Sequence, residues 1–99
     1  MPKGYKIANQ AVLDLEEIWF YTAQKWSVEQ ADRYYSLIFD EIEYICNHQK
    51  GRKAANHIKK GYFTAKVKSH LIFFKLNNEL VEIIRILHER MDIEDRLME

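Results

Sequence analysis

Basic side chains and a histidine gather in the last third of the chain, in a combination that could carry out phosphate chemistry. Cleavage of RNA by attack of its own 2′-hydroxyl needs a general base, a general acid and cations that stabilise the charged phosphorane. His88 or Glu89 could serve as the base or the acid. The cations that could hold the phosphate are Arg85, Arg90, Lys66 and Lys68.

This set is permissive, because 15 basic residues and 4 histidines would furnish some such combination in many proteins. The residue types alone therefore leave catalysis open. His48 and His57 are too isolated to indicate a metal site, and there is no glycine-rich phosphate loop. We expect no cofactor and no metal.

Several single residues have both a structural and a functional interpretation. For His70 we favour hydrogen bonding to the backbone, whereas His88 is open between packing and function. Arg85 stands among isoleucines, and we expect it to pair with the nearby chain end at Asp92 or to contact a target. Residues expected to pack without a functional role are Trp19, Trp26 and Cys46.

Charge is sorted along the chain although the net charge is zero. Residues 1–50 carry a net charge of −3, residues 51–87 a net charge of +6, and residues 88–99 a net charge of −3. The middle segment is a local positive field, which suits an anionic partner such as nucleic acid or an acidic peptide. A solvated lysine-rich surface is the simpler interpretation of the same pattern.

Length and composition predict one domain over residues 1–99 with a thin core. The single cysteine excludes an internal disulfide. The first ten residues lack the apolar region of a signal peptide, and the longest apolar runs are four residues. We therefore expect a cytoplasmic protein that does not enter a membrane.

The elements that must position these residues form a helical block followed by a β block. Lys3–Ala8 is a short strand candidate, and a helix with Asn9 as its cap follows it to about Trp26. Ser27 and Gln30 form a capping box for a second helix, which runs from about Val28 to about His48. Helices joined this closely fold back as an antiparallel hairpin.

The β block contains three predicted strands, at Tyr62–Lys68, His70–Leu76 and Leu80–Leu87. A two-residue turn at Asn77-Asn78 would place Phe74 opposite Val81, Ile72 opposite Ile83 and His70 opposite Arg85 on one face. The predicted class is α+β, with a mainly antiparallel sheet of three to four strands in the order β-α-α-β-β-β. The helices cover one face, and the other is left partly bare unless Met91–Glu99 folds over it.

Three stretches in order make the chain resemble the toxins of the RelE/ParE superfamily, and the ParE branch most closely. The first runs from Ala11 to Ile18, the second is Gly61-Tyr62 leading into Ser69–Phe74, and the third is Ile83–Asp92. One departure is Phe63, where the family commonly has an arginine. The segment from Leu87 to Asp92 is of the ParE type, which has no clear nuclease constellation.

The resemblance implies a toxin made beside an antitoxin in a type II toxin–antitoxin module. The ParE branch poisons DNA gyrase, and the RelE branch cuts messenger RNA in the ribosome. An acidic antitoxin chain would wrap the toxin in a hetero-oligomeric complex, and a non-toxic relic that only binds its antitoxin is a third alternative. The candidate antitoxin- or target-binding residues are Lys66, Lys68, Tyr62, Lys75, Arg85, His88 and Arg90.

Overall fold

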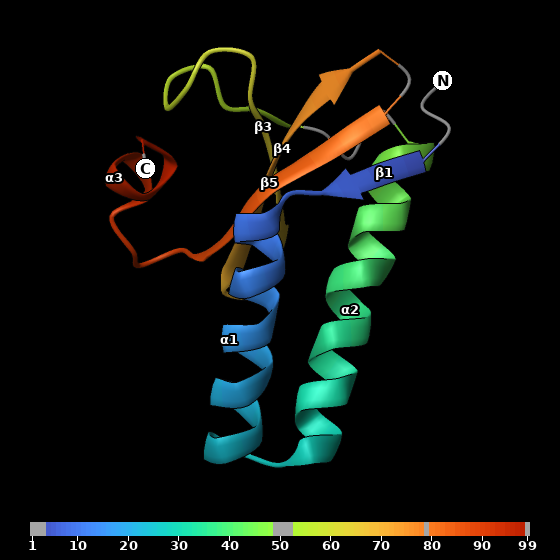
Figure 1. Cartoon of the computed structure of the whole chain (residues 1–99), viewed down its shortest axis with the longest axis vertical. Coiled ribbons are helices and arrows are strands. Elements are labelled where there is room, and N and C mark those ends of the chain that lie inside the picture. The colour runs from blue at the N-terminus through green and yellow to red at the C-terminus, as the bar shows by residue number, and fades with distance from the viewer. Residues whose placement is uncertain (1–3, 49–52, 79, 99) are drawn as a thin grey trace.

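The computed structural model describes residues 4–48, 53–78 and 80–98 of the chain. Two long helices lie side by side on one face of a twisted sheet, and a short helix lies near the other face (Figure 1). The elements in chain order are β1 (Gly4–Ile7), α1 (Asn9–Lys25), α2 (Val28–Asn47), β2 (Lys53–Ala54), β3 (Phe63–Val67), β4 (His70–Asn77), β5 (Leu80–His88) and α3 (Ile93–Met98).

The α+β class and the order of elements are confirmed, with β2 and α3 as additions. The sheet order is β1-β5-β4-β3-β2, with β1 parallel to β5 and the other pairs antiparallel. The parallel pair arises because the α1–α2 hairpin carries the chain from β1 back across the sheet. No helix in the described parts of the chain is long and apolar enough to cross a membrane.

The two helices begin differently. At α2, the Ser27 hydroxyl oxygen accepts a hydrogen bond from the Gln30 backbone N–H at 3.1 Å, as the capping pattern predicts. The prediction of a cap at Asn9 is wrong, because Asn9 is the first helical residue and Ala8 stands at the N-cap without a side-chain hydrogen bond. The backbone N–H of Ala8 instead bonds the Ile83 carbonyl at 2.9 Å, which ties the start of α1 to β5.

The register of the β4–β5 hairpin differs from the predicted one. Asn77 pairs with Leu80, so the turn is centred one residue later than Asn77-Asn78, with Asn78 at a φ of +57°. A register shift between Phe73 and Phe74 then changes every following pair. As a result His70 pairs with His88, not with Arg85.

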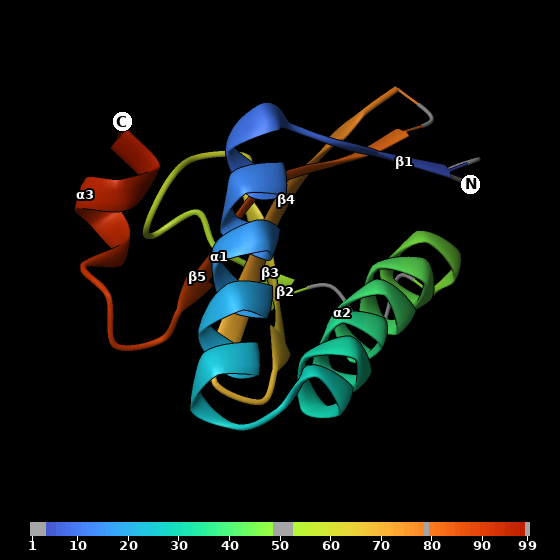
Figure 2. The same ribbon diagram turned by 60° about the horizontal axis from the view of Figure 1, so that its bottom comes forward.

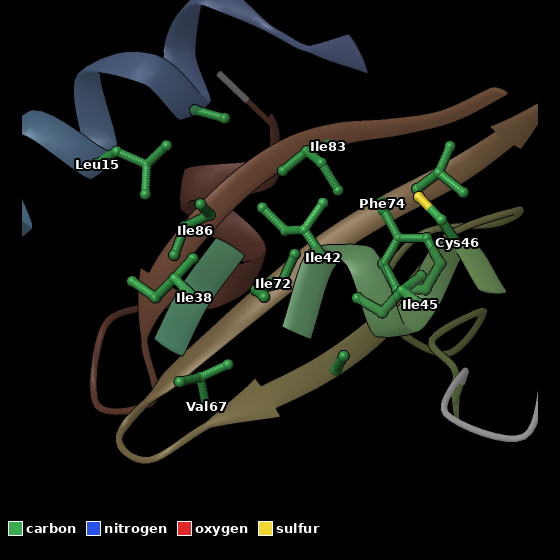
Figure 3. Close-up of a cluster of buried hydrophobic side chains, with 13 residues drawn as sticks. Leu15, Ile38, Ile42, Ile45, Cys46, Val67, Ile72, Phe74, Ile83 and Ile86 are labelled. Carbon is green, nitrogen blue, oxygen red and sulfur yellow. The ribbon is translucent and has the colours of Figure 1, made fainter. Parts of the chain in front are cut away.

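The main core lies between the helical hairpin and the sheet (Figure 3). Isoleucines at one-turn spacing on α2, including Ile38, Ile42 and Ile45, pack on Ile72 and Phe74 of β4. Burying one such side chain contributes roughly 1.5–3 kcal/mol before conformational entropy is counted. Cys46 is buried in this core, as expected.

A second, smaller core lies on the opposite face of the sheet. Phe73 and Leu87 are fully buried there beneath Leu97 of α3 and the segment that contains Ala55 and Tyr62. The chain's own C-terminal segment therefore covers part of this face, which is the alternative that the sequence left open.

Candidate functional site

Arg85, a candidate for phosphate or target contact, is fixed inside the structure. Its Nε donates to Asp14 Oδ2 at 2.8 Å and its Nη2 to Asp14 Oδ1 at 3.0 Å, and its Nη1 donates to the Arg96 carbonyl at 3.0 Å. Only 7% of Arg85 is exposed. The expected partner Asp92 is therefore replaced by Asp14 of α1.

Asp14 also accepts a hydrogen bond from the backbone of β5 at the edge of the sheet. β1 pairs with β5 only as far as Ile83, which leaves the backbone of β5 beyond that point without a strand partner on this side. Asp14 Oδ2 accepts a hydrogen bond from the Ile86 backbone N–H at 2.9 Å. The carboxylate thus satisfies a buried strand N–H and the guanidinium together, and Arg85 links it to α3.

The remaining predicted site residues separate onto two surfaces. Lys66 lies opposite Leu71 in the β3–β4 ladder, and Lys75 lies two residues beyond Phe73 on β4. Because alternate residues of a strand share a face, both lysines belong to the face that carries the smaller core. We call this the second face. Tyr62 is buried within it, beneath the chain's own segments.

Lys68 and His88 belong to a different surface, a groove between the helical hairpin and the sheet. It encloses about 710 Å³ and is lined by the last turns of α1, the first turns of α2, the β3–β4 turn and the adjoining strand ends. We call it the hairpin groove. Figure 2 shows the β3–β4 turn on the same side as the connection between α1 and α2.

Two histidines form part of this groove. His70 and His88 pair across β4 and β5, with their rings edge to face and 5.2 Å between centroids. Tyr34 of α2 donates its hydroxyl proton to the Val67 carbonyl at 3.1 Å, and its oxygen lies 2.5 Å from His70 Nδ1. The expected backbone bond of His70 is thus replaced by a side-chain bond to α2.

Burial sets the charge states in this cluster. Burial and, to a smaller extent, the neighbouring His88 together lower the pKa of His70 to about 4, although Asp14 and Glu89 oppose the shift. Burial also raises the pKa of the Tyr34 hydroxyl, which a backbone hydrogen bond from Ser69 opposes. His70 is therefore neutral at physiological pH and adds no positive charge to the groove.

The residues proposed for RNA cleavage differ in their surroundings. Glu89 forms an ion pair with Lys66 at 3.5 Å, whereas His88 shares the hairpin groove with Lys68. Arg90 is exposed, and its backbone N–H donates to His88 Nδ1 at 3.1 Å. Among the described residues no three His, Cys, Asp or Glu side chains are grouped as a metal site requires.

Sequence reasoning misplaced the two tryptophans and missed part of the groove. Trp26 is 69% exposed at the end of α1, so its predicted packing role is wrong. Trp19 is half-buried, and its ring N–H donates to Asp32 at 2.9 Å. Helical periodicity puts both tryptophans on the same face of α1. The helix, however, extends beyond the end of the sheet before it reaches Trp26, so the sheet does not cover that side chain.

A model of the "ParE toxin of type II toxin-antitoxin system, parDE" matches residues 5–93. The toxin ParE1 of Caulobacter vibrioides is 36% identical over 90 residues, which cover 91% of this chain and 93% of that protein. The toxin ParE1 of Mycobacterium tuberculosis is 31% identical over 98 residues, 98% of this chain and 100% of that one.

One solved structure, described as a chromosomal ParDE toxin–antitoxin system from P. aeruginosa, has the same fold. The TM-score is 0.77 over 89% of this chain and 96% of that chain, with 16% sequence identity. At this identity the likeness supports the fold alone.

Proposed function

The chain belongs to the ParE toxin family, and we propose that it arrests growth by binding DNA gyrase until an acidic antitoxin chain neutralises it. Its assignment as a toxin of a type II toxin–antitoxin system follows from the family match over residues 5–93. That match carries the proposal, because gyrase is the target that the resemblance to the ParE branch implies.

The environment of the charged residues supports binding over cleavage. Arg85, which a nuclease would need near a phosphate, is held by Asp14 and by the Arg96 carbonyl. Glu89 is occupied by Lys66. Action on a protein target needs no acid–base pair and no free arginine.

We assign the antitoxin to the second face. Lys66 stands there in an exposed ion pair with Glu89, and Lys75 lies opposite Glu82 in the ladder. An antitoxin carboxylate would compete with Glu89 for Lys66, because the ion pair between them is a weak surface pair.

Beside these lysines are Leu71 and Ile84, which the smaller core leaves half-buried. Cations next to partly covered apolar side chains suit a peptide that carries both carboxylates and apolar anchors. Such a peptide would bury the part of the second face that α3 leaves exposed.

The decisive experiment mixes the purified chain with gyrase and ATP on relaxed plasmid, to follow supercoiling, and on supercoiled plasmid, to follow DNA cleavage. We expect inhibition of supercoiling or a trapped DNA-cleavage complex, and neither would be seen with gyrase alone. If neither appears in the presence of the chain, gyrase is not the target. Growth arrest on induction without an antitoxin is also expected, and unimpaired growth would indicate an antitoxin-binding relic.

The ribosomal alternative is tested separately, by primer extension on a translated message. Cuts at the ribosomal A site that disappear when His88 and Arg90 are replaced would favour a messenger RNA endonuclease. We expect an intact message.

The antitoxin surface has its own test. The short acidic product of a neighbouring reading frame should bind the chain, and replacing Lys66 and Lys75 by glutamate should weaken that binding by about tenfold or more. The matched control replaces Lys25 and Arg33, two exposed cations of the hairpin groove, by glutamate. Equal losses from the two double variants would place the antitoxin elsewhere.

A further inference from the structure

The hairpin groove has a chemistry that binding at the second face does not use. Lys25 of α1, Arg33 of α2 and Lys68 of the β3–β4 turn all line it. Among the described residues that line this groove, none carries a negative charge. The three cations come from three elements, so the folded chain itself brings them together.

The groove also displays aromatic rings that the fold leaves open. Trp26 is 69% exposed and Tyr21 is 60% exposed, although large aromatic side chains usually bury most of their surface. Lys25 lies over the Tyr21 ring, 5.5 Å from its centroid, and its Nζ donates to the Tyr21 hydroxyl oxygen at 3.1 Å. Cation and ring are thereby held beside each other at the rim.

The β3–β4 turn holds Lys68 in a left-handed backbone conformation. Lys68 has a φ of +52°, a left-handed conformation that a side chain with a Cβ adopts at a cost and that glycine adopts freely. The chain therefore carries a cation at a position where glycine would relieve strain. The positive φ itself follows from the two-residue hairpin between Val67 and His70, whose favoured turn types require it at this position.

We propose that the hairpin groove binds single-stranded nucleic acid, with phosphates on Lys25, Arg33 and Lys68 and with bases stacked on Trp26 and Tyr21. Exposed rings next to cations on a track of one charge sign are the features by which proteins hold unpaired strands. A volume of about 710 Å³ lies within the range of ligand sites, roughly 300–1,000 Å³.

The aromatic rings favour an unpaired strand over the other anionic partners. A duplex presents phosphates but hides the faces of its bases. It would contact the cations, but its bases could not stack on Trp26 and Tyr21. The proposed function assigns an acidic peptide to the second face. The proposal concerns the isolated chain and does not depend on the identity of the protein target.

The test is fluorescence anisotropy with labelled oligothymidylate and oligouridylate of about 12 nucleotides, and with the duplex of the former. Single strands should bind more tightly than the duplex, and the two probes distinguish DNA from RNA. Between about 50 and 200 mM salt, the log of the binding constant should fall with a slope of about −2, as expected for three phosphate contacts.

Matched variants locate the site. Trp26→Ala should weaken single-strand binding by about tenfold or more, whereas Phe20→Ala, an aromatic that is 61% exposed on α1 outside the groove, should not. Arg33→Gln and Lys68→Gln should each make the salt slope shallower, and Lys75→Gln should leave it unchanged. These side chains are at the surface, and circular dichroism would verify folding of each variant.

Three results would overturn the proposal. They are equal losses from Trp26→Ala and Phe20→Ala, duplex binding as tight as single-strand binding, and binding of a labelled oligoglutamate peptide in the groove without any binding of oligonucleotide. Since no gyrase is present, failure here leaves the gyrase assay to be judged separately.

Discussion

Asp14 and Arg85 form a buried bidentate ion pair between α1 and β5 across 71 sequence positions, with N–O distances of 2.8 and 3.0 Å. Both side chains are only 9% exposed. The same carboxylate accepts the Ile86 N–H, and the same guanidinium donates to the Arg96 carbonyl. One pair thus joins the helical hairpin, the sheet edge and α3.

Removing the carboxylate should be severely destabilising. Asp14→Ala removes the carboxylate that accepts two hydrogen bonds from the buried Arg85 guanidinium and one from the Ile86 N–H, which should cost roughly 3–5 kcal/mol of unfolding free energy. Urea denaturation measures this loss. Glu16→Ala, an exposed carboxylate two residues along α1, should change it by less than about 0.5 kcal/mol.

The ion pair also predicts that substitutions of Asp14 and of Arg85 have non-additive effects on the unfolding free energy. Adding Arg85→Met to Asp14→Ala should restore part of the lost free energy, because a buried charge that has lost the Asp14 carboxylate is replaced by an apolar side chain. Equal or greater instability of the double variant would mean that Arg85 stabilises the fold mainly through Arg96.

Local patterns predicted the helices and main strands closely, because periodicity and capping act over a few residues. The Ser27 cap and the strand boundaries around His70 and Leu80 are examples. The hairpin register was missed because moving the turn by one residue changes each pairing partner by two positions, which keeps every side chain on the same face and leaves the hydrophobic pattern unchanged. The register shift between Phe73 and Phe74 has no signature in composition.

The site was less accessible to sequence reasoning, because its contacts are distant along the chain. Nothing near Arg85 indicates Asp14, and nothing near His70 indicates Tyr34, 36 positions away. Trp26 was assigned to the core because periodicity cannot show where the sheet beneath a helix ends. The net charge of residues 51–87 did indicate a cationic surface. It could not show that Lys66 and Lys68 lie on different surfaces.

Stability should fall in mild acid because of His70. Burial lowers the pKa of His70 to about 4 from 6.5. As pH falls through that interval, His70 becomes protonated in the unfolded chain but stays neutral in the folded chain. Proton binding therefore stabilises the unfolded state relative to the folded state. The urea midpoint should drop between about pH 7 and pH 4.5, and His70→Gln should reduce the drop. His57→Gln, an exposed histidine, should leave the drop unchanged, and an equal effect of both variants would contradict this account.

Tyr34→Phe should destabilise the junction of α2 with the sheet. It removes the hydroxyl that donates to the Val67 carbonyl and contacts His70 Nδ1, so two part-buried polar groups lose a partner. The expected cost is about 1–3 kcal/mol. Thermal or urea unfolding measures it, with Tyr35→Phe on the exposed side of α2 as the control. A cost no larger than that of Tyr35→Phe would show that water replaces the hydroxyl.

Lys68→Gly should raise stability while it weakens the proposed strand binding. Glycine relieves the left-handed strain at a φ of +52°, and after its own entropy cost the net gain should be roughly 0.5–1 kcal/mol. Lys68→Ala removes the same charge but keeps the strain, so it should not be stabilised. If the two variants are equally stable, the turn is not strained.

The helix α3 should open locally, well below the free energy of global unfolding. Two apolar side chains, Ile93 and Leu97, and hydrogen bonds to the Arg96 and Leu97 carbonyls hold it to the second face. Leu97→Ala should therefore speed amide hydrogen exchange in α3, while exchange in β4 changes little. Leu13→Ala, at a side chain that is 50% exposed on α1, should affect neither. The contrary result is that Leu97→Ala lowers the free energy of amide exchange across β4 by about 2 kcal/mol or more, the cost of a core cavity. That result would show that α3 unfolds together with the cooperative core.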